Sequence, residues 1–263
     1  MQFKTFVLYQ CRQYLLRWRW LLPVAAGLLL GYWAGNIIGM LKAQAVFSEA
    51  SASLPSGGAL EAFIWAFGKP EIVYFVITAI YIYLVSDYLP GTSYEQAVLL
   101  RLGSRNTWWV GKVFLVFVST IVYTVLLFGS FLLMVLWRYP LSVEWSPFTR
   151  YDFGMGLEYA IKNGTPIQAV LSISTFLILG WCAIGLLILT VTLLARKNTV
   201  GFLAGALVVV LSISGSVLGG PIGGEGWMAY LLIQNHLEYT PLWSPVRVIP
   251  EYASWIFWLI WIS

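Results

Sequence analysis

Charged residues are scarce in this chain of 263 residues, and their scarcity excludes an ordinary soluble fold. Asp, Glu, Lys and Arg make up 10% of the sequence, whereas 60% of the residues are hydrophobic. A soluble domain is about 25% charged and about 45–50% apolar, so this chain lacks the polar side chains that a water-exposed surface needs. Lipid is the solvent that fits such a composition. We therefore predict an all-α integral membrane protein.

Histidine and cysteine are also rare. His236 is the single histidine, and no cysteine or second histidine stands near it to complete a metal site. Cys11 and Cys182 fall in separate apolar segments, which favours packing roles over a disulfide. The patterns G-x-x-x-x-G-K-[ST], H-E-x-x-H and G-x-S-x-G are missing. The sequence thus predicts no bound metal, no ATP hydrolysis by this chain and no enzymatic activity of its own.

Long apolar runs predict a bundle of about six membrane-spanning helices in a single domain over 1–263. The predicted spans are 21–40, 71–88, 112–137, 167–195 and 200–219, and 251–263 is the start of a sixth. Loops are expected at 41–69, 89–111, 138–165 and 220–250, with a tight turn at 196–199. No charged residue falls in the middle of a full span. Ion-driven carriers use intramembrane ionisable groups, so this absence argues against one.

The first twenty residues have a different pattern from the spans. Apolar side chains recur there at spacings of three and four, with basic and amide side chains on the other faces, which predicts an amphipathic helix. Such a helix lies in the membrane interface, or it extends the first span into the cytoplasm. Its apolar residues are Phe3, Phe6, Val7, Cys11, Tyr14, Leu15 and Trp18.

Basic residues set the predicted orientation. With the N-terminus in the cytoplasm, the inner segments hold nine of the fifteen Lys and Arg residues, and only Asp87 and Glu95 oppose them. The outer segments hold the other six basic residues and the remaining nine acids. An excess of Lys and Arg marks cytoplasmic loops, so we predict a cytoplasmic N-terminus.

The inner loop before the third span carries the most specific local pattern. Pro90 and Gly91 mark a turn, and Gly103 follows as a helix stop. Thr92 with Glu95, or Ser93 with Gln96, forms a capping box. These signals predict a short helix at 93–102. A helix of about ten residues is marginal in water by itself. It therefore rests on the membrane surface or is held by a soluble partner, and these residues alone leave both possibilities open.

Together, the N-terminal amphipathic helix, the paired spans and the short cytoplasmic helix resemble the permease subunit of type 2 ABC exporters. The likeness covers nearly the whole chain in layout, and small bacterial permeases that export phenol-soluble modulins or bacteriocin-like peptides are the most similar kind. Its sharpest local piece is Arg-Leu-Gly-Ser-Arg-x-x-Trp-Trp-x-x-Lys at 101–112. In that family the helix between spans two and three couples to a cytosolic ATPase. The residues implied for coupling are Tyr94, Glu95, Val98, Leu99, Arg101, Leu102 and Arg105.

The resemblance also implies partners and a cargo. The chain would lie in the bacterial cell membrane with a second permease subunit and with cytosolic ABC ATPase subunits that hold ATP and magnesium. It would bind no cofactor and no nucleic acid itself. The uncharged spans suit an amphipathic or hydrophobic cargo such as a peptide. The alternative is a membrane sensor or scaffold that acts through its long outer loops, and an ion-driven carrier ranks third.

Glycines repeat every four residues along two of the predicted spans. This spacing lets two helix backbones approach closely, either within one subunit or at a seam between subunits. The resemblance implies the second possibility, because the family's permeases pair through their first and fifth spans. The seam residues are Gly27, Gly31, Gly35, Gly39, Gly201 and Gly205.

Overall fold

The computed structural model of this chain describes residues 3–46, 58–68, 72–87, 104–146, 164–217 and 256–257, and these residues form helices and turns with no strand among them. Four helices dominate: α2 (Leu21–Val46), α6 (Arg105–Leu136), α9 (Pro166–Ala195) and α10 (Asn198–Val217). Three stretches are long and apolar enough to cross a membrane: Trp18–Met40, Arg105–Leu136 and Pro166–Ala195. The prediction of an all-helical fold is thereby confirmed for the described residues, and these three stretches support the prediction of a membrane protein.

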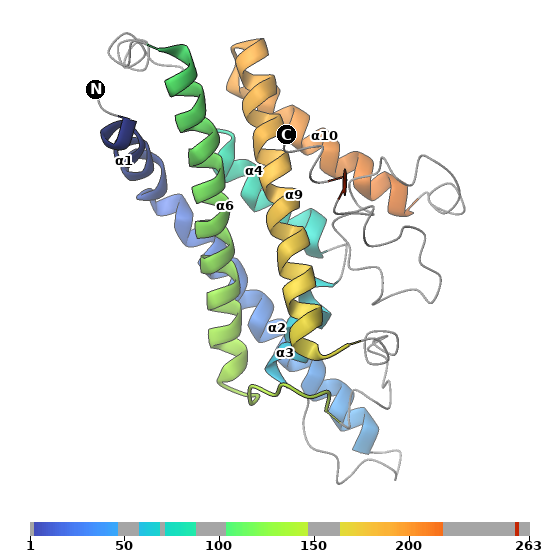
Figure 1. The fold of residues 1–263 in the computed structure, drawn as a ribbon. Helices are drawn as coiled ribbons and strands as arrows, with labels where there is room; N and C mark the ends of the chain where they lie inside the picture. The colour runs from blue at the N-terminus through green and yellow to red at the C-terminus, as the bar shows by residue number, and fades with distance from the viewer. Residues whose placement is uncertain are drawn as a thin grey trace.

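The helices α2 and α6 run in the same direction across the bundle, and α9 runs in the opposite direction between α6 and α10 in the chain (Figure 1). The start of α6 and the turn between α9 and α10 lie at one end of the bundle, together with the N-terminal helix α1 (Phe3–Leu15). The end of α2, the end of α6 and the start of α9 lie at the other end. The described residues of the segments with the predicted excess of basic residues therefore lie at one end of the bundle.

Capping residues explain where α9 begins and ends. Thr165 Oγ1 accepts a hydrogen bond from the backbone N–H of Gln168 (3.4 Å), and Gln168 Oε1 accepts one from Thr165 N–H (3.0 Å), forming a capping box. Pro166 suits the first turn, where its missing N–H costs nothing. Arg196 then adopts φ 55°, which turns the chain into α10. The predicted span 167–195 matches α9 as a helix, and 200–217 of the predicted span 200–219 lie in α10.

One face of α6 carries large apolar side chains that no other part of the described chain covers. Phe114, Ile121, Val125 and Leu133 are exposed, whereas Tyr123, Leu127 and Phe131 are fully buried against the other helices. A water-soluble protein rarely exposes so continuous an apolar face. Lipid is the environment that suits this face, in agreement with the composition.

Two of the predicted loops were partly wrong. Within 41–69, α2 continues to Val46 and a further helix, α3 (Ala59–Phe67), follows. All nine residues of α3 are buried, and it packs between α2, α6 and α9. Apart from Glu61 its side chains are apolar, and it is too short to resemble a span, so neither periodicity nor length marked it. In 89–111, the residues from Arg105 onwards belong to α6, because the side chain of Ser104 caps the helix there (Thr107 N to Ser104 Oγ, 3.4 Å).

The predicted span 71–88 is a π-helical segment, η2 (Ile72–Thr78), joined to the short helix α4 (Ala79–Val85). Buried polar contacts surround the joint. Tyr123 Oη donates to the Ile77 carbonyl (2.6 Å), Trp181 Nε1 donates to Thr78 Oγ1 (3.2 Å), and the Tyr81 and Thr120 hydroxyls lie 2.8 Å apart. Side chains from α6 and α9 thus satisfy polar groups at the irregular segment, which such a segment requires in an apolar core.

Candidate functional site

The candidate site lies at the junction between α1 and α2, at the end of the bundle that holds the start of α6. A short 3₁₀ turn, η1 (Trp18–Trp20), joins the two helices, and Trp20 Nε1 donates to the Tyr14 carbonyl (2.9 Å). Of the amphipathic helix expected at 1–20, the structure shows α1 over Phe3–Leu15, which ends before η1. Its face formed by Phe6, Gln10 and Tyr14, spaced by four residues, is buried, and α1 packs against α6 (Figure 1). That face therefore contacts protein.

Lys112 is the centre of the contact between α1 and α6. Its side chain is fully buried, and its Nζ donates to Gln10 Oε1 at 2.8 Å. The ammonium group lies 5.0 Å from the ring centroid of Tyr14 and 5.7 Å from that of Trp108. A buried cation is costly unless it is hydrogen-bonded and paired, and an acceptor plus two aromatic faces reduce that cost. α1 is thus fixed to the second turn of α6.

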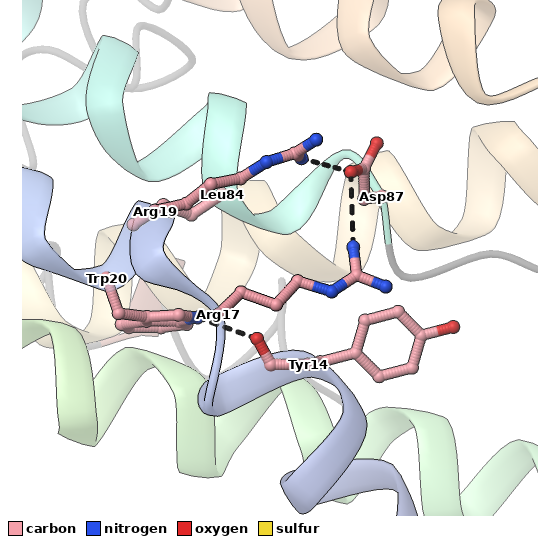
Figure 2. Close-up of a pocket in the computed structure, with 6 residues that line it drawn as sticks. All are labelled: Tyr14, Arg17, Arg19, Trp20, Leu84 and Asp87. Atoms are coloured by element: carbon pink, nitrogen blue, oxygen red, sulfur yellow. Dashed lines mark hydrogen bonds and ion pairs between the residues drawn. The ribbon is translucent and has the colours of Figure 1, made fainter.

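A cluster of three charged side chains fixes the other end of the junction. Asp87, just after α4, accepts a hydrogen bond from Arg19 and lies 3.5 Å from an Arg17 guanidinium nitrogen (Figure 2). The Arg17 guanidinium also lies 5.1 Å from the centroid of the Tyr14 ring, and the Arg19 guanidinium lies 5.2 Å from that of Tyr83. Asp87 therefore makes a contact at a helix end, the role that its position at the edge of a predicted span favours.

Tyr14 connects the two contacts. Its ring lies about equally far from Arg17, at 5.1 Å, and from Lys112, at 5.0 Å. Asp87 is the last described residue before 88–103, and Trp108 and Lys112 are among the first side chains after it. Asp87 and Lys112, on either side of 88–103, consequently both contact 10–20, which comprises the end of α1 and η1.

Of the predicted coupling residues, the structure describes Arg105. Tyr94, Glu95, Val98, Leu99, Arg101 and Leu102 lie outside the described residues. Arg105 is the first residue of α6 and is exposed.

The predicted seam glycines lie close to other helices of the same chain. A Cβ on Gly31 would lie 2.8 Å from the Phe131 carbonyl oxygen, and one on Gly27 would overlap Ser130 and the Leu127 carbonyl, both on α6. A Cβ added to Gly201 or to Gly205 would likewise lie 2.8 Å from an atom of Ile188 on α9. A Cβ added to Gly35 or Gly39 would lie 3.5 or 3.7 Å from the Tyr139 side chain, which is an ordinary contact distance. The tight positions therefore allow close packing between helices of one chain, and a seam between subunits at these glycines stays a prediction.

Sequence reasoning missed two buried ionisable side chains. Lys112 was assigned to the membrane boundary, but the packing of α1 over α6 buries it completely. Glu61 was assigned to an outer loop, but it lies in α3 and accepts hydrogen bonds from Gly58 N–H (2.9 Å), Ser146 N–H (2.5 Å) and Ser146 Oγ (2.8 Å). The spacing of Gly58 and Glu61 before an apolar run was the available signal, since an acid at the third helical position caps a helix.

Cys11 offers a check on how α1 packs. Burial raises the pKa of the Cys11 thiol above its ordinary value, because a low-dielectric environment disfavours the thiolate. The thiolate is the reactive species, so iodoacetamide is expected to alkylate Cys11 more slowly than free cysteine at roughly pH 8. The rate should keep rising at a pH where that of free cysteine has levelled off. A Cys182→Ala chain isolates this thiol, and a rate equal to that of free cysteine would mean that α1 does not pack as described.

Within the described residues, no three His, Cys, Asp or Glu side chains gather in a way that could hold a metal ion. Comparisons with protein-family models, with curated proteins and with solved structures find no match to this chain. Function must therefore be argued from the site itself and from the sequence pattern around it.

Proposed function

We propose that this chain is the membrane-spanning permease subunit of an ATP-driven exporter, and that its energy input enters through 93–102. The observation that carries the proposal is that described residues on both sides of 88–103 contact the same segment, 10–20. One flank is tied by Asp87 to Arg17 and Arg19, and the other by Lys112 to Gln10. A cytosolic motor that moves this segment would move α1 and the start of α2 with it.

The packing of α2 gives such a movement a route into the bundle. α2 begins directly after η1 and lies along α6, with Gly27 and Gly31 allowing close backbone approach. Interfaces this tight shift as units, because packed helices are poorly compressible. Displacement of the junction would therefore be passed to the paired spans α2 and α6. In the proposed complex, a second permease subunit completes the path, and an amphipathic or hydrophobic peptide is the cargo.

The apolar character of the spans supports this choice of cargo. The middle parts of α2, α6 and α9 carry no charged residue. Such walls offer little to a small hydrophilic ion but suit a molecule with its own apolar face. Among the described residues, Glu61 is the buried acid, and its hydrogen bonds to Gly58 and Ser146 give it a capping role. An ion-driven carrier therefore remains the weakest alternative.

Co-purification tests the proposal. The tagged chain is extracted in mild detergent and its partners are identified by mass spectrometry, for the wild type and for Arg101→Glu/Arg105→Glu. A cytosolic ATPase is expected with the wild type and is expected to fall at least tenfold with the double variant, since reversing the charge of contact residues costs several kcal/mol.

The matched control is Arg196→Glu/Lys197→Glu. This variant reverses the same charge in an exposed turn at the same end of the bundle, and it is expected to keep the ATPase. Equal loss in both variants would indicate non-specific electrostatics. If no ATPase accompanies the wild type in any mild detergent, the proposal is wrong and a membrane sensor or scaffold takes its place.

A further inference from the structure

A small hollow opens where η1 meets the end of α4, and it carries more positive than negative charge. Its lining consists of Tyr14, Arg17, Arg19, Trp20, Leu84 and Asp87 (Figure 2). Two guanidinium groups thus share one carboxylate. The Lys112 ammonium group, 5.0 Å from the ring centroid of Tyr14, adds a further positive charge nearby.

Asp87 does not occupy all the N–H donors of the two arginines. A guanidinium nitrogen of Arg17 lies 3.5 Å from the Asp87 carboxylate, and the side chains of Arg17 and Arg19 are 38% and 30% exposed. A guanidinium group has five N–H donors in a fixed fork that matches the oxygens of a phosphate. Both arginines therefore keep donors that a phosphate oxygen could reach from outside, and Asp87 would compete with it.

Apolar side chains beside the arginines identify the source of the phosphate. Leu16 and Trp18 alternate with Arg17 and Arg19 along the chain and are 78% and 73% exposed. Leu21, at the start of the first apolar stretch, is 65% exposed. Exposed Trp and Leu beside Arg, at the foot of a spanning helix, are typical of the depth where headgroups meet acyl chains. Binding of a free phosphate from water would not be strengthened by these apolar side chains.

We propose that this hollow binds the headgroup phosphate of an anionic phospholipid, held by Arg17 and Arg19 in competition with Asp87. Leu16, Trp18 and Leu21 contact the acyl chains of the same lipid layer. Basic pockets at the cytoplasmic side of membrane helices bind anionic headgroups by this chemistry. The site requires only that α1 lie at a membrane surface, and it is independent of export.

Native mass spectrometry of the full chain in detergent tests the site, with phosphatidylglycerol or phosphatidylcholine added in separate titrations. The wild type is expected to retain phosphatidylglycerol preferentially. Arg17→Gln/Arg19→Gln is expected to lower that retention at least about tenfold, since each charge-assisted hydrogen bond is worth about a factor of ten or more. Arg12→Gln, an exposed arginine on α1, is the matched control and is expected to retain the lipid.

Asp87→Asn separates lipid binding from a purely structural ion cluster. If Asp87 competes with the lipid, removing its charge raises retention of phosphatidylglycerol several-fold. A structural cluster would instead lose thermal stability in both arginine and aspartate variants, with no change in bound lipid, and that result would overturn the proposal. Should the double variant fail to elute as a single species, Arg17→Lys, which keeps the charge and loses the fork, is expected to give intermediate retention.

A further titration arm uses inorganic phosphate and glycerol phosphate. Neither is expected to displace phosphatidylglycerol at concentrations that equal the lipid. Equal binding of phosphatidylcholine and phosphatidylglycerol, or displacement of the lipid by free phosphate at equal concentration, would overturn the assignment to an anionic lipid.

Discussion

Replacing Gly27 by leucine is expected to prevent the chain from folding, with a loss of stability of about 3 kcal/mol or more. A Cβ at this position would overlap Ser130 Oγ and the carbonyl oxygen of Leu127, and would lie 3.1 Å from the Phe131 backbone nitrogen. Two of these obstacles are backbone atoms of α6, which cannot rotate away as a side chain could. Yield of a single species in size-exclusion chromatography and the thermal midpoint in detergent measure the effect.

Gly129→Leu is the matched control for this substitution. Gly129 lies on α6, and nothing is within 4 Å of a Cβ built there, so leucine is expected to change the thermal midpoint little. The effect along α2 should also be graded. Gly31→Leu should be nearly as damaging as Gly27→Leu, whereas Gly35→Leu should be milder, because a Cβ at Gly35 meets only the side chains of Tyr139 and Arg138, at 3.5 Å or more.

The oligomeric state of the variant separates the two uses of these glycines. If Gly27 serves packing between α2 and α6 of one chain, the leucine variant loses folded protein in every oligomeric form. A Gly27→Leu chain that folds normally but elutes as a monomer, where the wild type elutes as a dimer, would contradict this packing and would assign the glycine to a seam between subunits.

The long apolar helices could be predicted from sequence because lipid imposes one solution on the backbone. Where no water is available, every N–H and C=O must be satisfied within the helix, so a long apolar run fixes both the element and its approximate ends. The predicted span 167–195 differs from α9 by a single residue at its start, since Thr165 and Gln168 also carry a local capping signal. Local rules are enough in such a case.

The helix α3 could not be predicted because its stability comes from other helices. Its nine residues are too few to fold alone, and they follow a Ser-Leu-Pro-Ser-Gly-Gly run that indicates a loop. Burial between α2, α6 and α9 supplies the stabilisation. No periodic pattern reports such burial, because all faces of the helix are covered.

The candidate site could be predicted only as separate pieces. The basic face of 1–20 and the acid at the end of the second span were both visible, but Arg19 and Asp87 are 68 positions apart, and Gln10 and Lys112 are 102 apart. Pairings at such separations depend on how the helices pack, which one sequence does not encode in a local pattern. The helix at 93–102 stays a prediction, since it lies outside the described residues.

The buried carboxylate of Glu61 gives the second large expected effect. It accepts hydrogen bonds from Gly58 N–H, Ser146 N–H and Ser146 Oγ at 2.9, 2.5 and 2.8 Å. It therefore caps α3 and also holds the end of the segment 138–146, which follows α6. Trp145, next to Ser146, donates from its indole nitrogen to the Gly164 carbonyl (2.6 Å), just before α9 begins. One carboxylate thus organises the connections between three helices.

Glu61→Leu is expected to destabilise the chain by about 3 kcal/mol, because two backbone N–H groups and one hydroxyl lose their acceptor in a buried place. Glu61→Gln should cost less, since its amide oxygen keeps part of the bonding while its NH₂ group faces N–H donors. Ser146→Ala, which removes one donor and leaves the carboxylate bonded, should cost about 1 kcal/mol. Thermal midpoints in detergent rank the three variants.

Limited proteolysis then shows which segment of the Glu61→Leu chain loses its packing. Glu61→Leu should expose the segment 138–146 to cleavage, because its attachment to α3 is lost, while α9 and α10 keep the packing that Gly201 and Gly205 allow. Glu144→Gln changes an exposed acid two residues from Ser146 and is expected to leave both stability and cleavage unchanged. If Glu61→Gln folds with wild-type stability and protease resistance but abolishes a pH-dependent transport activity, the capping role is wrong. Glu61 would then be the intramembrane proton site of an ion-driven carrier.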